Sequence, residues 1–425
     1  MKRMFLAASM LLATTAFFPC RSHGEAWISM GPDGGSIKRL LQDPTNPNVI
    51  YIISGSYPSR MFKSIDKGSQ WSEIALDFQI NLNALEPNRK NPSEMFTCGG
   101  GLFARSTDSG ATWSSIVVSG FNFYDLIPDS TDQNILHGCG YDWNSVTQIA
   151  SIAYFKSTNK GADWSKSVIP SLERAYAYAV APDPKNSRHV WIGGLEQIGG
   201  VTGAKLCRST NGGTSWTDMT GTITGTVQDI FIDSTDVKRI LVVTSANTFR
   251  STDNGASWQP CSGFPSGNRV TQDPKNRNTF YIAGFNKAYK STDGGVKWSA
   301  YSNGLTGGTG YDIAVDRSAS DNLFGAYDFG FYKSTNGSAN WNPSNAGLAL
   351  SNVTAVKLIG GSAPALLAAY FNDGLYKTLQ PLGKVHQSQT VGWTRLPTFY
   401  DCHNLTDLLV SPADPKVLYA FEGGG

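Results

Sequence analysis

The chain has 425 residues and a net charge of +2, and charged residues make up only 16% of it. This balance, with no run of basic residues, argues against a nucleic-acid partner and against binding to an anionic membrane surface. Glycine occurs 45 times and aromatic residues reach 12%. Such a composition is typical of a globular, turn-rich, all-β protein.

The first residues have the features of an export signal. Two basic residues at positions 2–3 precede a short apolar run that ends at Phe18. The run is too short to span a bilayer comfortably, which favours a cleaved signal over a membrane anchor. We therefore expect residues 1–24 to be a signal peptide and residues 27–425 to be secreted or periplasmic, with no stable membrane insertion.

The rest of the chain is organised around a phrase that reads Ser-x-Asp-x-Gly-x-x-Trp or a near variant. Seven copies recur at a spacing of about 40–52 residues, which indicates a repeat architecture. The Asp or Asn folds onto nearby backbone N–H groups as an Asx turn, and the Gly two residues later takes positive φ at no steric cost. The flanking segments are strand-like, so each phrase closes a hairpin whose Trp buries a large ring. The Asx positions are Asp66, Asp108, Asn159, Asn211, Asp253, Asp293 and Asn336, and the last copy carries Ser338 where Gly is expected.

Each repeat has room for four short strands. Two alternating segments precede the one that leads into the phrase, and a fourth segment begins at its Trp, with no helical periodicity between them. This pattern predicts the blade of an all-β propeller. Nine first strands can be counted, starting near Arg39, Leu82, Asp125, Ala179, Asp229, Arg269, Asp312, Thr354 and Asp407.

We therefore predict about eight four-stranded antiparallel blades plus a partial ninth repeat. Residues 27–30 read like an orphan fourth strand, and the strand that should lie between the two ends of the chain is missing. Either an eight-bladed ring carries an overhang, or the chain is the front of a larger or tandem propeller.

The repeated phrase resembles the Asp-box, or BNR repeat, of sialidases, sortilin-type propellers, xyloglucan-cleaving propeller glycosidases and photosystem II assembly-factor propellers. The resemblance covers nearly the whole chain after the signal and implies the propeller fold, and in these families the Asp-box is structural and lies away from the active site. Sialidases carry Arg-Ile-Pro before the first box, whereas the nearest phrase here, Arg395-Leu396-Pro397, lies far downstream. Xyloglucan-cleaving propellers have an opening Gly-rich phrase that resembles residues 30–35 of this chain. At the position where they place a catalytic Asp, however, this chain has Gly55.

Two neighbouring repeats have long segments between their second and third strands, at 140–151 and 194–203. Loops on a rigid scaffold carry function, and the links beside these segments are aromatic. We expect one patch at the channel mouth that contacts a glycan or a peptide. The alternative is that about half of these rings pack between blades, since large aromatic residues are usually core. The candidate ligand-binding residues are Phe123, Tyr124, Tyr141, Trp143, Tyr176 and Glu196, with Phe121, Arg174 and Tyr178 beside them.

A second set of candidates lies at equivalent positions near the starts of the innermost strands. Paired carboxylates there would suit glycoside hydrolysis, one as the acid and the other as base or nucleophile. An Asp that recurs at one repeat position is more simply a strand-end hydrogen-bonding residue, and we favour this structural interpretation. The positions carry Asp125, Asp229, Asp312 and Asp407, with Arg39 and Arg269 in other repeats.

Other chemical signals are weak. The five His have no metal-ligand spacing, and no Gly-rich phosphate loop opens a helix, so no metal or cofactor is predicted. Cys98 and Cys139 lie at equivalent positions of adjacent repeats. Adjacent sheets lie about 10 Å apart, too far for a disulfide, so we expect both thiols to be free and buried.

Two functional hypotheses follow from these observations. The leading one is an exported, monomeric, non-catalytic propeller that binds a protein or polysaccharide at the channel mouth. The alternative is a glycoside hydrolase, xyloglucanase- or sialidase-like, that acts at the same mouth. An enzyme of that kind would hold two carboxylates about 5–9.5 Å apart in an open cleft.

Overall fold

The computed structural model describes residues 34–171, 173–305 and 307–348, together with six strands between 353 and 422. Every regular element in these ranges is a β-strand. Among the described residues no helix is long and apolar enough to cross a membrane. The expected signal peptide and the orphan strand at 27–30 lie outside these ranges.

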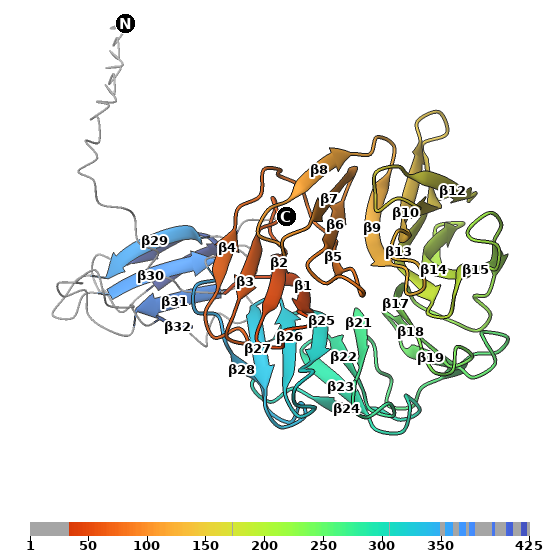
Figure 1. The fold of residues 1–425 in the computed structure, drawn as a ribbon. Helices are drawn as coiled ribbons and strands as arrows, with labels where there is room; N and C mark the ends of the chain where they lie inside the picture. The colour runs from red at the N-terminus through yellow and green to blue at the C-terminus, as the bar shows by residue number, and fades with distance from the viewer. Residues whose placement is uncertain are drawn as a thin grey trace, which may run out of the picture.

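The first seven repeats form seven four-stranded antiparallel blades arranged in a ring (Figure 1). Blade 1 contains β1 (Ile37–Gln42), β2 (Ile50–Ser54), β3 (Met61–Ser64) and β4 (Ser72–Ile74), and blade 2 contains β5 (Ala84–Pro87), β6 (Met95–Gly99), β7 (Leu102–Ser106) and β8 (Ser114–Val117). Blade 3 contains β9 (Asn122–Pro128), β10 (Leu136–Asn144), β11 (Ile149–Ser157) and β12 (Ser165–Ile169), and blade 4 contains β13 (Ala175–Asp183), β14 (Asn186–Ile198), β15 (Val201–Ser209) and β16 (Thr217–Asp218). Blade 5 contains β17 (Val227–Ile232), β18 (Ile240–Thr244), β19 (Thr248–Ser251) and β20 (Gln259–Pro260), and blade 6 contains β21 (Arg269–Gln272), β22 (Phe280–Gly284), β23 (Lys287–Ser291) and β24 (Ser299–Tyr301). Blade 7 contains β25 (Gly310–Val315), β26 (Leu323–Tyr327), β27 (Gly330–Ser334) and β28 (Asn342–Pro343).

The ring closes after seven blades, so the predicted count of about eight was wrong. Blade 7 packs directly on blade 1, where Phe324 and Phe331 join Phe62 in one apolar cluster. The Trp71 Nε1–H donates to the Ser344 carbonyl at 3.1 Å across the same seam. The sequence counts repeats, but the packing angle between adjacent sheets decides how many of them complete a ring.

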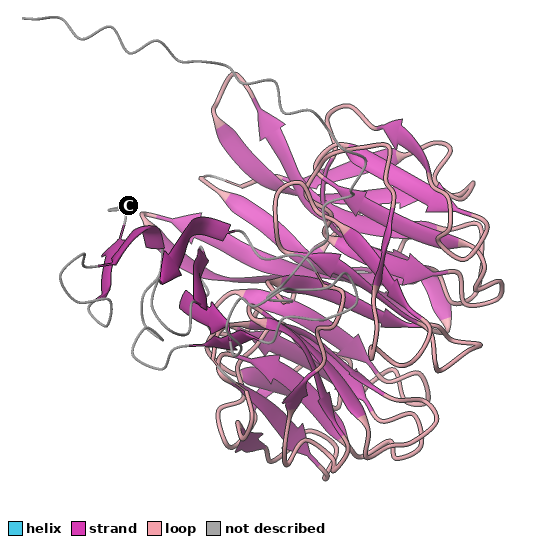
Figure 2. Ribbon diagram, turned by 90° about the vertical axis from the view of Figure 1, so that its left-hand side faces the viewer, coloured by secondary structure: helices cyan, strands magenta, loops and turns pink. Residues whose placement is uncertain are grey.

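The later repeats lie outside the ring, beside blade 1 (Figures 1 and 2). The eighth repeat forms its own four-stranded sheet. The two strands of the ninth, β33 and β34, pair with each other, and β33 packs against β29. Their bounds are β29 (Val353–Ile359), β30 (Ala365–Tyr370), β31 (Gly374–Thr378), β32 (Trp393–Arg395), β33 (Leu405–Val410) and β34 (Leu418–Glu422).

The core of the ring lies in the seams between blades. Each of seven apolar clusters draws its residues from two adjacent blades, so every seam in the described ring has its own core. Strands β2, β6, β18, β22 and β26 are buried at every residue, because each is covered by neighbouring strands and by the flanking blades. Burial of apolar surface in these seams stabilises the ring as a whole.

The repeated phrase forms the same turn in all seven blades. In blade 1, Ser64 Oγ accepts the Gly68 N–H at 2.7 Å and donates to Asp66 Oδ1 at 2.7 Å. The Ser–Gly contact, Ser–Ser in blade 7, recurs at 2.7–3.0 Å in every blade. The Gly also packs on the preceding blade: a Cβ added to Gly161 would lie 2.2 Å from the Phe103 ring. Each phrase therefore joins two blades as well as closing a hairpin.

Blade 7 breaks this pattern at Ser338. Its φ is +77°, a conformation that costs an L-residue about 1–2 kcal/mol. The Ser338 hydroxyl is buried without a hydrogen-bond partner, as is Trp341 Nε1 of the same turn. The turn keeps its backbone shape because Ser334 Oγ still accepts the Ser338 N–H at 3.0 Å.

Candidate functional site

Blades 3 and 4 carry two long hairpins. The pair β10–β11 continues without interruption to Asn144 and Ile149, and β14–β15 continues to Ile198 and Val201. The segments 140–151 and 194–203, expected to be long loops, are therefore mostly strand. Only Gly199-Gly200, with φ of +59° and +76°, turns the second hairpin, as positive φ at both central residues of a tight turn requires.

Four tyrosines gather where these hairpins leave the ring. The Tyr124 ring lies 5.6 Å from Tyr141 and 5.2 Å from Tyr178, and Tyr141 lies 5.2 Å from Tyr176 (centroid to centroid). All four side chains are partly buried, so each ring keeps some accessible surface. We call these four residues the tyrosine cluster. Sequence reasoning placed three of them in the candidate patch and the fourth beside it.

Two phenols of the cluster have raised pKa values. Burial, reinforced by the neighbouring Tyr141, Tyr178 and Tyr176, raises the pKa of Tyr124 to about 12. Burial also raises the pKa of Tyr178. At neutral pH Tyr124 and Tyr178 therefore offer flat apolar faces and hydroxyl groups that both donate and accept hydrogen bonds.

The other predicted patch residues have three different environments: Phe123 is in the core, Trp143 is at the surface, and Glu196 forms contacts that hold a hairpin. Phe123 has no exposed surface and packs 4.8 Å from Phe155 and 5.0 Å from Trp164, so the structure places it in the core rather than in the patch. Alternation along β9 turns Phe123 and Tyr124 to opposite faces of the strand. Trp143 lies farther along β10 and is 44% exposed.

Glu196 supports the second hairpin. Its carboxylate lies 2.8 Å from Lys205 Nζ and accepts a hydrogen bond from Ser171 Oγ at 3.0 Å. Lys205 is also 2.9 Å from Asp218, and these contacts with two carboxylates raise the lysine pKa against the effect of burial. Glu196 thus anchors β14 to β15 and to the preceding link, beside Tyr176.

The recurring Asp residues hold the blades together around the channel. Asp312 Oδ2 accepts the Leu40 N–H at 3.0 Å and so joins blade 7 to blade 1. Asp229 Oδ2 accepts the Val270 N–H at 2.8 Å in the same way. Each Asp contacts the first strand of the next blade, so the contact is a strand-end hydrogen bond of the kind that the structural interpretation proposed.

The remaining recurring Asp residues are Asp125 and Asp407. Asp125 Oδ2 accepts the Val180 N–H at 3.2 Å, and its side chain is 1% exposed. Asp407 lies just after the register shift in β33, as Asp312 does in β25. Its side chain lies outside the described part of the chain.

Two arginines balance these carboxylates. Arg269 Nη1 lies 3.7 Å from both Asp125 and Asp229, and its Nη2 lies 3.4 Å from Glu86. Arg39 lies 3.8 Å from Asp125 Oδ1, an oxygen with no hydrogen-bond partner. Burial raises the pKa of Asp229 and Asp312 although Arg269 opposes the shift. Burial likewise raises the pKa of Glu86 to about 7.

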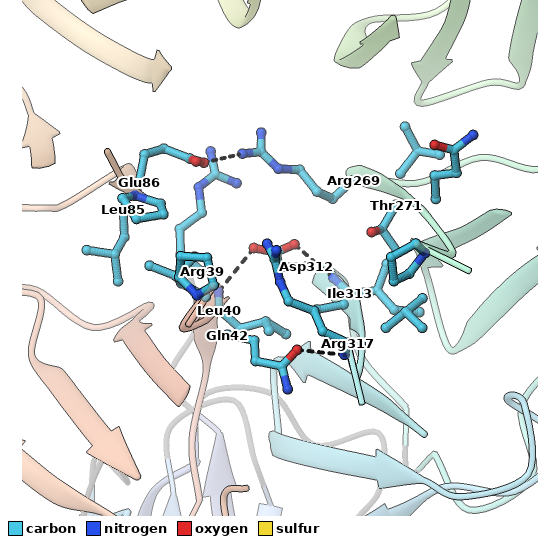
Figure 3. Close-up of a pocket in the computed structure, with 18 of the residues that line it drawn as sticks. Arg39, Leu40, Gln42, Leu85, Glu86, Arg269, Thr271, Asp312, Ile313 and Arg317 are labelled. Atoms are coloured by element: carbon cyan, nitrogen blue, oxygen red, sulfur yellow. Dashed lines mark hydrogen bonds and ion pairs between the residues drawn. The ribbon is translucent and has the colours of Figure 1, made fainter. Parts of the chain in front are cut away.

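A pocket of about 640 Å³ occupies the channel beside this charge cluster (Figure 3). Arg39, Glu86, Arg269 and Asp312 line it within the channel. Arg89 and Arg317 line it where the innermost strands end. Sequence reasoning missed Glu86, Arg89 and Arg317, because it looked for positions that recur rather than for positions that depart from the repeat.

The structure also bears on the other chemical signals. Gly55 donates to the Ser36 carbonyl at 2.7 Å, and a Cβ there would lie 2.3 Å from Ser36 Oγ, so this position has no room for an Asp side chain. Within the described residues no group of three His, Cys, Asp or Glu could hold a metal ion. Cys98 and Cys139 are free and buried, as predicted.

Comparisons with known proteins give the fold a context. No protein-family model matches the chain. A stretch of 98 residues is 32% identical to the xyloglucanase Xgh74A of Acetivibrio thermocellus, which covers 19% of this chain and only 12% of that protein. The chain therefore matches a small part of its curated relative.

Solved structures resemble a much larger part of the chain. A GH74 xyloglucanase from Xanthomonas campestris superposes with a TM-score of 0.64 at 14% identity, covering 87% of this chain and 68% of that one. An ancestral GH74 enzyme gives a TM-score of 0.52 at 16% identity, covering 94% and 68%. YCF48 bound to a D1 peptide gives 0.50 at 14% identity, covering 71% and 92%. At these identities the likeness establishes the β-propeller fold alone.

Proposed function

We propose that this protein is an exported, monomeric, non-catalytic propeller whose repeats are Asp-boxes and whose hairpin face holds a protein or glycan ligand. The observation that carries the proposal is the tyrosine cluster at the base of the two hairpins. Partly accessible phenol rings stack on sugar rings or on extended peptides and also hydrogen-bond to them. Trp143, Ile198 and Val201 add exposed apolar surface along the same hairpins.

The state of the channel carboxylates supports a non-catalytic role. Asp125, Asp229 and Asp312 each accept a backbone N–H from the next blade, and their residues are at most 8% exposed. A glycosidase carboxylate acts on the substrate or on the attacking water, so it needs access to the reacting bond. These three side chains instead join adjacent blades of the ring.

The second candidate is a glycoside hydrolase. It is favoured by the 98-residue likeness to a xyloglucanase and by the GH74 folds among the structural neighbours. In this case the carboxylates would have to come from another part of the chain, because the three Asp residues of the ring hold backbone groups.

A binding screen with a turnover readout separates the two candidates. The purified protein is applied to a glycan array that includes xyloglucan fragments, and each hit is assayed for released reducing sugar. We expect binding without release, and loss of binding in Tyr124→Ala and Tyr141→Ala. Phe285→Ala, which removes an exposed ring from blade 6, is the matched control and should bind normally.

Two outcomes would change the proposal. Release of reducing sugar overturns the non-catalytic role and supports the hydrolase. If no glycan binds, the ligand is sought as a protein by pull-down from the exporting cell, and a captured partner should be lost from the same two Tyr variants. A partner that both variants retain would contradict the tyrosine cluster as the binding site.

A further inference from the structure

One repeat position at the channel is occupied by ordinary turn residues in most blades and by arginine in two. We call the equivalent position near the start of each innermost strand, which Arg39 occupies in blade 1, the ring position. The position in question lies five residues after it, where the innermost strand ends. The strand register fixes the equivalence, since Arg39, Ala84 and Asp312 each pair with the fourth residue of the second strand in their own blade. In blades 1 to 7 the position carries Pro44, Arg89, Ser130, Pro184, Ser234, Pro274 and Arg317.

Pro and Ser suit this position because it begins a tight turn after an Asp or Asn. Arg has no such role in a turn, so turn chemistry does not account for Arg89 or Arg317. Blades 2 and 7 both adjoin blade 1, which brings the two arginines to either side of the Pro44 turn. Both line the channel pocket (Figure 3 labels Arg317).

Neither guanidinium forms an ion pair within the described part of the chain. No carboxylate among the described residues lies within 4.0 Å of Arg89 or Arg317, and neither side chain makes a hydrogen bond to them. Arg39 and Arg269, in contrast, each have both an ion pair and a hydrogen bond. Desolvation, and then repulsion by Arg89, lower the pKa of Arg317. The opposing charge that acts on Arg317 is Asp43, whose Oδ1 already accepts the Thr45 and Asn46 N–H groups. Arg89 acts on Glu86, which is itself paired with Arg269.

A third departure from the repeat lies deeper in the same pocket. The position two residues after the ring position carries the uncharged residues Leu41, Phe231, Thr271 and Ala314 in the other pocket-lining blades, but Glu86 in blade 2. Glu86 is 26% exposed to the pocket and is held by Arg269. Among the described residues, the pocket thus has two arginines without an ion pair at its outer end and hydrogen-bonding groups, Glu86 and Gln272 among them, farther in.

We propose that the channel pocket is a binding site for a small anionic metabolite whose carboxylate or phosphate lies between Arg89 and Arg317. Guanidinium groups bind such oxyanions through paired, charge-assisted hydrogen bonds. A volume of about 640 Å³ fits a sugar acid or sugar phosphate, and it is within the range of small-molecule sites. The site opens on the face of the turns between first and second strands, opposite to the hairpins, so it is independent of the proposed function.

Differential scanning fluorimetry and calorimetric titration at low salt test this site with three probes. The probes are glucuronate, glucose 6-phosphate and neutral glucose. We expect at least one of the two anions to bind and stabilise the protein, and glucose to have no effect at the same concentration. Binding of both anions identifies a general oxyanion site, and binding of one shows whether carboxylate or phosphate is its natural group.

The variant Arg89→Ala/Arg317→Ala should weaken anion binding by about 10–100-fold. Both side chains are exposed, so the variant should keep the unfolding midpoint of the free protein. Lys238→Ala removes an exposed cation from another turn of the same face and should bind like the wild type. Anion affinity in the double variant within about twofold of the wild type, or no binding of either anion to the wild type at millimolar concentration, would overturn the site.

Discussion

Blades 3 and 4 differ from blades 5 to 7 in length although all five fold from the same repeat. The second strand has 13 residues in blade 4 and nine in blade 3, against five in each of blades 5, 6 and 7. The turns that the repeated phrase closes and the apolar seams are common to both groups. The shared elements therefore build the ring, and the added length carries the tyrosine cluster.

The channel shows a similar contrast between two levels: the ring position, and the ends of the innermost strands five residues farther on. At the ring position, Asp and Arg side chains are paired with each other and with backbone groups of the next blade. Five residues farther on, Arg89 and Arg317 lack such partners among the described residues. We conclude that the recurring charges stabilise the fold, whereas the charges that depart from the repeat are the better candidates for function.

The largest effect is expected from removing a ring Asp. Asp312→Ala leaves the buried Leu40 N–H without an acceptor and the channel arginines with less opposing charge, so we expect a loss of about 3 kcal/mol in the free energy of unfolding. Asp229→Ala should cost a similar amount at the seam with Val270. Chemical denaturation measures both. A loss below about 1 kcal/mol in each variant would show that the recurring Asp residues are not structural.

A smaller effect of opposite sign is expected in the turn of blade 7. Ser338→Gly relieves a residue at positive φ and removes a buried, unpaired hydroxyl, so it should stabilise the protein by about 1–2 kcal/mol. The reciprocal change in blade 6, Gly295→Ser, should destabilise it, because the new Cβ would lie 2.9 Å from Leu241. Equal effects of the two changes in thermal unfolding would contradict the account of the turn.

The smallest effect concerns Glu86 and depends on pH. Its pKa in the folded protein is about 7, raised from an ordinary value of 4.5, so the folded state retains a proton that the unfolded chain releases. Stability from this group is therefore present below about pH 4.5 and is lost as the pH rises through 7. Glu86→Gln should remove that dependence and be more stable than the wild type at pH 8, by on the order of 1 kcal/mol, but not at pH 4. An identical difference at both pH values would show that Glu86 does not titrate in this range.

Much of the fold could be predicted because its determinants are local. The Ser, Asx and Gly positions of the phrase set each turn through contacts within four residues, as Ser64 and Gly68 show. The number of blades could not be predicted, since it depends on how Phe331 and its neighbours pack against blade 1. The hairpins were mistaken for loops because their segments contain glycines, such as Gly140 and Gly194, that are typical of turns.

The candidate site was predicted in part for a related reason. Tyr124, Tyr141 and Tyr176 were found because equivalent strand ends of adjacent blades meet in space. Phe123 was misplaced because β9 has aromatic residues on both of its faces, and the sequence does not say which face meets the neighbouring blade. Arg89 and Arg317 are visible in the sequence only once the repeats have been aligned on the strand register.

The most direct test of the central claim is to measure stability and ligand binding together in two variants, with the ligand that binds most strongly in the screen. Our account predicts that Tyr124→Ala/Tyr141→Ala loses binding but keeps its unfolding midpoint, whereas Asp312→Asn is less stable but still binds, with no turnover in either. Turnover of the ligand by the wild type that Asp312→Asn abolishes while binding persists would contradict the account and make the channel carboxylates catalytic.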